Sequence, residues 1–395
     1  MNILVVNAGS TSFKCRLYSM PEETELARGS VDRIGGSYAE LSYYRGGQPV
    51  IVKERREIKT HADAVRIIIQ MLSSQQTGAI KSINEIDAVG FKTVQAGEKN
   101  GTVLLSEDVL DAMERYAPLA PAHNPPYLAC IRFFKEQLPS TPLVGVFEPG
   151  FHSNIPEYAR IFGTPYDWYA DHGIAKYGYH GATFRYVQTR LATYGFGESK
   201  RIIACHLGGS SSICAIKDGR SIDVSMNFTP QSGLLQSGRT GDIDPFVLPF
   251  IMERKGISLD AALKELSSNG GLKGISGIGA DMRDIQNAAA SGNKRAQLAI
   301  EKFVYDVVRY IGSFHVLLGG VDVIAFSGGI GFYNDEFRKM IIDRIAFLGI
   351  ELEKESAGRI EGRLTKDTSP IAVVVIDTNE EIVISRETAR LLAQL

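Results

Sequence analysis

One short pattern occurs twice in this chain, about half a chain apart, and it limits the possible folds more than any other feature. Residues 3–18 contain an apolar run, a loop of glycine and serine, and a second alternating run, and residues 202–216 repeat that order. Apolar runs of this length that flank turn residues are typical of two strands joined by a tight loop. The repeat therefore predicts two related halves that face one another, each opening with a strand–loop–strand unit.

Between and after these units, strand patterns alternate with helix patterns. Apolar periodicity predicts helices over residues 61–74, 107–116, 125–137, 244–254, 258–266, 296–317 and 380–395, and short apolar runs predict strands over 88–94, 143–147, 221–225, 323–326 and 371–376. Such alternation is typical of the α/β class. A chain of 395 residues is also too long for one comfortable hydrophobic core, so we expect two domains.

The overall charge excludes several kinds of partner. The formal net charge is −2 and the isoelectric point is about 6.4, so no general basic field favours nucleic acid or an anionic membrane. Local positive charge must then attract any anionic substrate. The cysteines, at positions 15, 130, 205 and 214, have no metal-type spacing, so we expect buried reduced thiols. The apolar runs are too short to span a bilayer, which predicts a cytoplasmic protein.

Glycine-rich segments follow three of the predicted strands. They are Gly9-Ser10, Gly208-Gly209 and the segment from Ser327 to Gly331. Glycine after a strand is most often only a turn, yet glycine also exposes backbone N–H groups that suit phosphate. Three such loops favour a nucleotide held in an interdomain cleft. Neither a P-loop nor a G-x-G-x-x-G segment between strand and helix occurs in the sequence, so phosphoryl chemistry would need another scaffold.

Two further segments carry candidate charged groups. Gly238 and Gly241 flank Arg239 and Thr240. Tight backbone there could aim the guanidinium at an anion, although a solvated surface turn is the commoner case. Glu380 and Glu381 follow an apolar strand and begin a predicted helix. They either complement the helix dipole, or one of them holds Mg²⁺ through water.

Motifs in a fixed order along the whole chain give these features a family context. They are Asn7–Lys14, Leu119–Pro125, Tyr177–Gly181, Asp223–Pro245, Gly274–Ile278, Asp281–Asp284 and Thr378–Glu381. With these motifs the chain resembles the acetate kinase family, within the superfamily that also includes sugar kinases, Hsp70 and actin. The resemblance implies reversible phosphoryl transfer between ATP and a short-chain carboxylate, which gives an acyl phosphate and ADP.

The resemblance also implies an architecture. The fold would be a duplicated ββαβαβα arrangement, with two domains and the active site in the cleft between them. We expect an N-terminal domain of residues 1–150, with the helix near 380–395 packing back on it, and a C-terminal nucleotide-binding domain of residues 151–379. A homodimer is the expected assembly, because relatives are commonly dimeric.

Site residues follow from the resemblance position by position. The implied catalytic residues are Arg239, His180, Glu148 and Asn7, and the implied substrate-binding residues are Lys92, Val94, His123, Tyr179 and Pro230. The residues implied to bind the nucleotide are Lys14, His206, Gly208, Gly209, Asp281, Arg283, Gly329 and Gly331. Glu380 and Asn7 would hold the metal, Mg²⁺ or Mn²⁺, and ATP or ADP would be the co-substrate.

The chemistry explains why such residue types are needed. A carboxylate is already ionised at neutral pH, so this nucleophile needs no general base. The difficulty is to bring one anion toward another, which requires positioning and positive charge. Arginine suits this task because its planar fork holds two oxygens and stays protonated.

The chain departs from the family pattern around the carboxylate. Lys92 stands where an arginine is usual, and Glu148 stands where an aspartate is usual and extends the carboxylate by about one methylene. Ala122 replaces a usual leucine and Tyr179 a usual phenylalanine. Any one change fits neutral drift, but together they suggest a hypothesis, namely that the preferred substrate is larger or more polar than acetate, such as propionate.

Phe332 and Tyr333 alter the stretch that would contact adenine, so two alternatives stay open. One is a related kinase that uses another phosphoryl donor such as pyrophosphate. The other is a nucleotide-binding protein of this fold without efficient catalysis, although the retained polar residues argue against it. A sugar kinase fits less well, because it would need an aspartate base to activate a hydroxyl group.

Overall fold

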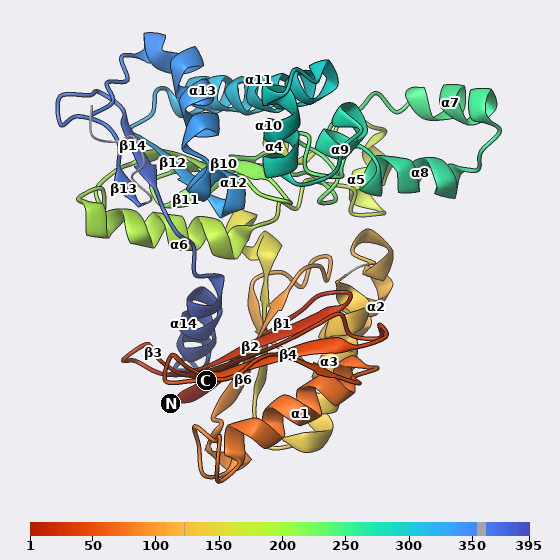
Figure 1. Cartoon of the computed structure of the whole chain (residues 1–395), viewed down its shortest axis with the longest axis vertical. Helices are drawn as coiled ribbons and strands as arrows, with labels where there is room; N and C mark the ends of the chain where they lie inside the picture. Colours follow the sequence, from red (N-terminus) through yellow and green to blue (C-terminus); the bar gives the residue numbers. More distant parts are fainter. Residues whose placement is uncertain (122, 354–360) are drawn as a thin grey trace. The chain divides into compact units, whose positions relative to one another are not determined.

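The computed structural model describes residues 1–121, 123–353 and 361–395. The chain forms two compact units, of which the first is built from two separate stretches of the sequence and the second from one (Figure 1). Unit 1 contains Met1–Gly150 and Asn379–Leu395, and unit 2 contains Phe151–Thr378. None of the helices in the described part of the chain has the length and apolar character needed to cross a membrane.

Unit 1 is built around an eight-stranded mixed sheet. Its strands are β1 (Asn2–Ala8), β2 (Ser12–Ser19), β3 (Thr24–Asp32), β4 (Ala39–Arg45), β5 (Gln48–Arg56), β6 (Ala88–Thr93), β7 (Thr102–Leu104) and β8 (Leu143–Phe147). Their order across the sheet is β5-β4-β3-β2-β1-β6-β8-β7. β1, β6 and β8 are parallel neighbours, and the remaining pairs are antiparallel.

Unit 2 is built around a six-stranded mixed sheet. Its strands are β9 (Arg201–His206), β10 (Ser212–Lys217), β11 (Arg220–Val224), β12 (Val323–Ser327), β13 (Gly362–Arg363) and β14 (Ala372–Val375), in the order β11-β10-β9-β12-β14-β13. β9, β12 and β14 are parallel neighbours, and the other pairs are antiparallel.

The two sheets share one topology. In unit 1, β1 lies between β2 and β6, β3 is outside β2, and β8 is outside β6 with the short antiparallel strand β7 beyond it. In unit 2, β9 lies between β10 and β12, β11 is outside β10, and β14 is outside β12 with the short antiparallel strand β13 beyond it. The same parallel and antiparallel pairings recur in both. The duplication that the repeated sequence pattern predicts is therefore confirmed, and so is the α/β class. Unit 1 carries β4 and β5 as an addition.

Helices cover both faces of the sheet in unit 1. They are α1 (His61–Ser73), α2 (Glu107–Arg115), α3 (Asn124–Gln137) and α14 (Glu380–Leu392), with short 3-10 turns at Ile83–Glu85, Ala117–Leu119 and Glu148–His152. A capping box between Thr60 and Asp63 begins α1. Gly90 leaves room for Thr388 of α14 on one face, and Gly29 leaves room for Ile68 of α1 on the other. Both glycines permit close helix–sheet packing.

Unit 2 has ten helices in its described residues, and Figure 1 labels each of them. They are α4 (Glu157–Arg160), α5 (Tyr166–Ala170), α6 (Gly181–Leu191), α7 (Val247–Lys255), α8 (Leu259–Ser268), α9 (Gly271–Ser276), α10 (Met282–Ala290), α11 (Lys294–Leu318), α12 (Gly328–Tyr333) and α13 (Asp335–Ile345), with 3-10 turns at Ala192–Tyr194 and Ala346–Leu348.

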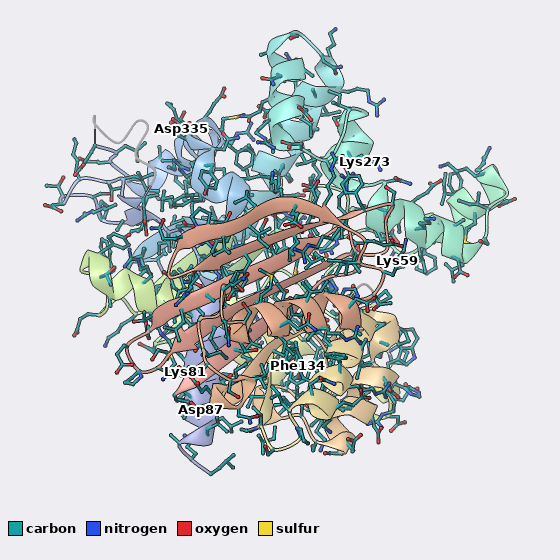
Figure 2. All side chains as sticks on the ribbon, turned by 60° about the horizontal axis from the view of Figure 1, so that its bottom comes forward. Lys59, Lys81, Asp87, Phe134, Lys273 and Asp335 are labelled. Atoms are coloured by element: carbon teal, nitrogen blue, oxygen red, sulfur yellow. The ribbon has the colours of Figure 1, made fainter. Side chains whose placement is uncertain are left out.

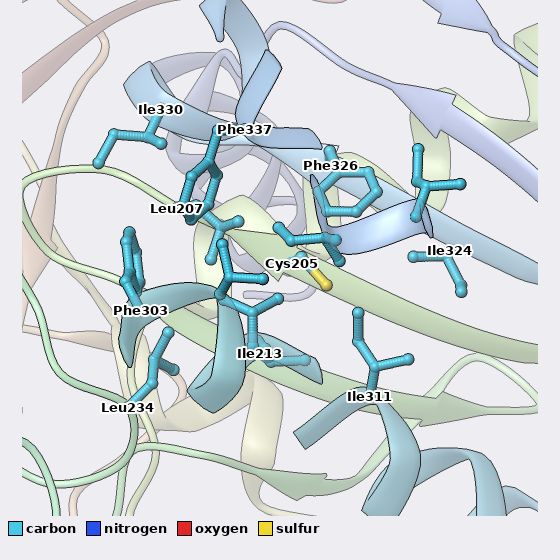
Figure 3. Close-up of a cluster of buried hydrophobic side chains, with 14 of the residues drawn as sticks. Cys205, Leu207, Ile213, Leu234, Phe303, Ile311, Ile324, Phe326, Ile330 and Phe337 are labelled. Atoms are coloured by element: carbon cyan, nitrogen blue, oxygen red, sulfur yellow. The ribbon is translucent and has the colours of Figure 1, made fainter. Parts of the chain in front are cut away.

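Strand alternation decides which helices cover each face of this sheet. Ile203 and Cys205 of β9 belong to one buried cluster with residues of α11 and α13, which Figure 3 shows in close-up. Ile202 and Ala204 point the other way, into a second cluster with residues of α6. Because successive side chains of a strand point to opposite faces, each apolar strand supplies two cores at once.

The described cysteines are buried and unpaired by disulfides, as the sequence predicts. Burial raises the pKa of the Cys15 and Cys130 thiols to about 12.

Aromatic packing completes the interior of unit 1, where the rings of Phe91 and Phe134 meet edge to face at 5.7 Å between centroids. Figure 2 labels Phe134 among the densely packed side chains of the helices of this unit.

Several element predictions differ from the structure. The glycine-rich segment after β12 is not a loop, because Gly328 begins the short helix α12 directly. α7 starts at Val247 rather than at residue 244, and the last helix ends at Leu392 rather than at 395. The helices α4, α5, α6, α9, α10, α12 and α13 were not predicted. α9 has only six residues, too few to show an apolar period.

Candidate active site

The loop that follows β9 connects the polar groups of unit 2. It runs from Gly208 to Ser211 and continues into Ser212 at the start of β10. Ser210 Oγ accepts a hydrogen bond from Arg239 Nη1 at 3.0 Å, and Ser212 Oγ lies 2.8 Å from His180 Nδ1. Two serines that are two residues apart thus hold a guanidinium and an imidazole, and this glycine–serine loop brings Arg239 and His180 to one place.

Arg239 is a largely enclosed cation whose hydrogen-bond acceptors are neutral. Besides Ser210, its Nη1 donates to Gln236 Oε1 at 3.1 Å and to the Pro230 carbonyl at 3.4 Å. No carboxylate among the described residues forms a salt bridge with it, and burial lowers the pKa of this guanidinium. A cation that is removed from water without a counter-charge favours binding of an anion.

The backbone that carries Arg239 is held on several sides. Gly241 has a φ of +80° and packs against residues 233–235, so a side chain there would collide with backbone. The carboxylate of Asp242 accepts from the Gly233 N–H at 2.8 Å and from the Tyr310 hydroxyl at 2.8 Å. The loop is therefore anchored to the long helix α11, which fits rigid presentation of the guanidinium.

His180 has an unusual backbone conformation. It caps α6 with φ of 59° and ψ of 29°, the left-handed region that residues other than glycine rarely adopt. Its ring lies 4.6 Å from the ring of His206, the last residue of β9, and His206 Nδ1 lies 3.3 Å from Ser327 Oγ. Strained residues of this kind cluster at functional sites, where the surrounding structure holds them in place.

A pocket of about 610 Å³ opens beside the same loop in unit 2. Its lining includes the glycines Gly208, Gly209 and Gly329 together with polar and acidic side chains of α10 and α13. That volume is in the usual range for small-molecule sites. The residues that complete the lining are Ser237, Ala280, Asp281, Met282, Arg283, Gln286, Ile330, Tyr333, Asn334, Asp335 and Glu336.

The structure brings five of the seven predicted nucleotide-binding residues of unit 2 to this pocket, whereas His206 and Gly331 do not line it. Asp281 and Arg283 lie at its wall and pair with each other, with Arg283 Nε 3.0 Å from Asp281 Oδ1. Asp281 also caps α10. Gly331 is buried; its N–H donates to the Leu207 carbonyl and its carbonyl accepts from Arg338, and its contact with the nucleotide stays a prediction.

In unit 1 the predicted polar residues gather around Lys92. Its ammonium group forms an ion pair with Glu380 Oε2 and lies 3.4 Å from Glu148 Oε1. The Lys92 side chain is 19% exposed and that of Glu148 is 5% exposed. Burial disfavours the lysine charge, but Glu380 and Glu148 more than offset that effect and raise the Lys92 pKa well above its usual value. The lysine thus provides one positive charge that two carboxylates of the protein itself share.

Asn7, at the end of β1, lies in the same unit. Its Oδ1 accepts from the Tyr127 hydroxyl at 3.0 Å, and burial raises the Tyr127 pKa. Lys14 of β2 lies opposite Asn7 in the β1–β2 pairing and is exposed, so its ammonium group is accessible. Val94 is buried just after β6, and His123 is half-buried at the cap of α3.

Sequence reasoning missed several residues at these sites. Gln236 is fully buried and shares its amide with Ser210 and Arg239, and the amides of Gln286 and Asn334 bond to each other at 2.6 Å across the pocket wall. Their positions in loops and at helix ends carry no distinctive spacing.

Of the residues at which the chain departs from the family pattern, Tyr179 is 2% exposed and its hydroxyl donates to the Phe228 carbonyl at 2.8 Å. Ala122 lies outside the described residues.

Comparison with known proteins places this geometry in one family. The Acetokinase family model matches residues 2–386. The chain is 41% identical to an acetate kinase of Clostridium novyi (strain NT), over 99% of this chain and 98% of the relative. It is 40% identical to an acetate kinase of Shouchella clausii (strain KSM-K16), over 98% and 99% of the two chains.

Two solved structures agree with these relatives. The Porphyromonas gingivalis acetate kinase has a TM-score of 0.89 and 35% identity and covers 99% of both chains. A propionate kinase from Francisella tularensis subsp. tularensis SCHU S4 has a TM-score of 0.90 and 32% identity and covers 98% of both. The chain therefore belongs to the acetokinase family of carboxylate-phosphorylating kinases.

Proposed function

We propose that this protein reversibly transfers a phosphoryl group between ATP and a short-chain carboxylate, giving an acyl phosphate and ADP. The observation that carries the proposal is Arg239, an enclosed guanidinium with only neutral hydrogen-bond acceptors in the described part of the chain. A transferred phosphoryl group carries its charge on oxygens that such a fork can hold. His180, linked to the same loop through Ser212, supplies a second polar contact to those oxygens.

The pocket supports a nucleotide as the phosphoryl donor. Acidic side chains of the lining, including Asp335 and Glu336, would repel phosphate, so the phosphates belong beside Gly208 and Gly329, whose backbones adjoin. The base and ribose then lie toward α10 and α13.

The same pocket bears on the pyrophosphate alternative. Phe332 is 5% exposed and packs edge to face on Tyr333, so it does not fill the pocket, and Tyr333 is a 72% exposed side chain at the wall. A space of about 610 Å³ exceeds what pyrophosphate alone would need, which favours ATP.

For the acceptor we propose a short-chain carboxylate, with acetate and propionate as the first two candidates. The relatives from Clostridium novyi and Shouchella clausii are named acetate kinases, and a solved relative is named a propionate kinase. Lys92 and Glu148, two of the residues behind the predicted preference for a larger or more polar acid, pair with each other. That preference stays a prediction, which the assay below decides.

Magnesium is the metal we propose, with manganese as a substitute. Mg²⁺ commonly uses one or two protein carboxylates together with water and phosphate oxygens. Glu380 fits that donor set, and the Asn7 amide oxygen is a second candidate. When bound, the ion would supply positive charge to the phosphate oxygens. Glu380 would have to exchange its ion pair with Lys92 for the metal.

A homodimer is the proposed assembly, and one surface of unit 2 supports it. None of the residues of α7 is buried; its N-cap residue Phe246 is 80% exposed and Phe250 within the helix is 58% exposed. Leu259 and Leu263 of the neighbouring helix α8 are 49% and 45% exposed. Apolar side chains that gather on one surface are typical of an interface. The cytoplasmic location stays a prediction from the sequence.

A substrate screen with a site variant tests the proposed function. ADP formation is measured with ATP and Mg²⁺ and with acetate, propionate, butyrate, and hydroxy and amino acids as acceptors. We expect turnover with a short-chain acid, and a loss of about 10³-fold or more in kcat for Arg239→Ala, as is typical of such groups. Arg344→Ala, a half-exposed arginine on α13, is the matched control. Failure of every carboxylate, or near-normal kcat in Arg239→Ala, would contradict the proposal.

A further inference from the structure

His152 is a buried histidine that the proposed reaction does not use. It ends the 3-10 turn Glu148–His152 and is 2% exposed. Its Nε2 lies 3.0 Å from the carbonyl oxygen of Tyr179, the residue directly before His180. Its Nδ1 lies 2.8 Å from the hydroxyl of Ser221 on β11. A single side chain therefore connects the sheet of unit 2 with the backbone that carries His180.

The partners of His152 determine where its proton lies. A carbonyl oxygen can only accept, so Nε2 must carry the hydrogen and donate it to Tyr179. Burial lowers the pKa of His152 to about 4, so the ring is neutral at pH 7 and Nδ1 is an acceptor. Ser221 then donates its hydroxyl proton to Nδ1 and can accept from Cys214, whose Sγ lies 3.3 Å from Ser221 Oγ. The two hydrogen bonds of the ring thus have one direction, from the Ser221 hydroxyl through His152 to the Tyr179 carbonyl.

Packing fixes the His152 ring as firmly as the hydrogen bonds do. Gly178 has a φ of +77°, and a Cβ there would lie 2.6 Å from the ring of His152. Phe151 and Phe184 contact the ring edge to face, with centroids 5.5 and 5.8 Å away. Phe184 belongs to α6, the helix that His180 caps. The ring therefore contacts both the segment before His180 and the helix after it.

The segment before His180 needs such support. Tyr177 and Gly178 donate their N–H groups to the Asn227 carbonyl, at 3.0 and 3.2 Å. Tyr179 is the next residue, and the carbonyl that it presents to His152 belongs to the peptide unit joining it to His180. Rotation of that peptide unit would change the φ of His180, which is already in the left-handed region.

We propose that His152 is a positioning residue for the phosphoryl-transfer reaction, whose Nε2–H holds the Tyr179 carbonyl and thereby sets the backbone and ring of His180 against Ser212. The inference rests on the proposed role of His180. Displacement of a catalytic group by roughly 1 Å can cost about 10²-fold in rate, so loss of this hydrogen bond should lower kcat and leave nucleotide binding unchanged.

Three substitutions separate the hydrogen bond from the packing. His152→Gln places an amide nitrogen where Nε2 lies and can still donate to Tyr179, whereas His152→Asn reaches only the position of Nδ1 and His152→Phe retains the ring without a donor. We expect kcat within about 3-fold of wild type for His152→Gln, and a loss of roughly 10- to 100-fold for His152→Asn and His152→Phe. The Kd for ATP, measured by calorimetry, should change less than about 2-fold in all three. His172→Gln, an exposed histidine of the same unit, is the control.

A second readout does not depend on activity. Nitrogen-15 NMR of histidine-labelled wild-type protein should show His152 as the neutral Nε2–H tautomer, with the His180 ring signals shifted in His152→Phe and unshifted in His152→Gln. If no carboxylate is phosphorylated, the proposed function fails, yet these signals still test the positioning. Equal loss of kcat in the Gln and Phe variants, full activity of a folded His152→Phe, or an Nδ1–H tautomer would each overturn the inference.

Discussion

Removal of the Lys92 ammonium group tests the electrostatic reasoning about unit 1. The variant is Lys92→Met, which keeps most of the side-chain volume and removes the charge that faces Glu148 and Glu380. At the 3.4 Å between Lys92 Nζ and Glu148 Oε1, the attraction between two unit charges is about 5 kcal/mol at an effective dielectric constant of ~20. Part of that attraction is offset by the cost of burying the lysine. Measured costs of breaking buried pairs by removing one partner are about 3–5 kcal/mol.

We therefore expect Lys92→Met to lower the free energy of unfolding by about 3–5 kcal/mol at pH 7.5, because two carboxylates lose their counter-charge. Urea titration followed by far-UV circular dichroism measures the change. The loss should shrink as the pH is lowered toward 5, since protonation of one carboxylate removes the uncompensated charge.

Lys59→Met is the matched control for this experiment. Lys59 lies 3.1 Å from Glu57, but the two side chains are 57% and 75% exposed, and exposed pairs contribute little. Figure 2 labels Lys59. A Lys92→Met protein that loses less than about 1 kcal/mol, or no more than the control, would show that Lys92 does not hold the two carboxylates.

Three further predictions concern other parts of the chain. The four cysteines should not react with a disulfide reagent at pH 8 until the protein unfolds, because burial raises the pKa of each thiol. The pKa of His152 is about 4 in the folded protein and about 6.5 in the unfolded chain. The free energy of unfolding should therefore fall by up to about 3 kcal/mol as the pH is lowered from 6.5 to 4, and His152→Phe should lack this component. Tyr310→Phe removes the hydroxyl that Asp242 accepts and should cost about 1 kcal/mol of unfolding free energy in urea titration.

The sequence predicts the fold well where local pattern and global topology agree. The apolar runs that became β1, β6, β8, β9 and β12 are buried on both faces, so hydrophobicity alone identifies them. The duplication of the sheet was predictable because the strand–loop–strand unit repeats. Short helices such as α9 and α12 were not predicted, because glycines in a helix lower its propensity and tertiary contacts hold these turns instead.

The candidate site was predictable in its residue types and not in its connections. Glycines beside charged residues indicated phosphate chemistry around Gly208 and Arg239. The partners that hold those groups are distant in sequence. Lys92 and Glu380 are separated by 288 positions, and Asp242 and Tyr310 by 68. A single sequence does not show such pairings, and so it could not show that Lys92 pairs with two carboxylates of its own unit.

The most direct test of the central claim runs the reaction toward ATP. Purified protein is mixed with acetyl phosphate or propionyl phosphate, ADP and Mg²⁺, and ATP is measured by a coupled enzyme assay, with Arg239→Ala in parallel. The account predicts ATP formation by the wild-type protein from at least one acyl phosphate and a rate lower by about 10³-fold or more in the variant. No ATP from either acyl phosphate, or equal rates for the two proteins, would contradict it.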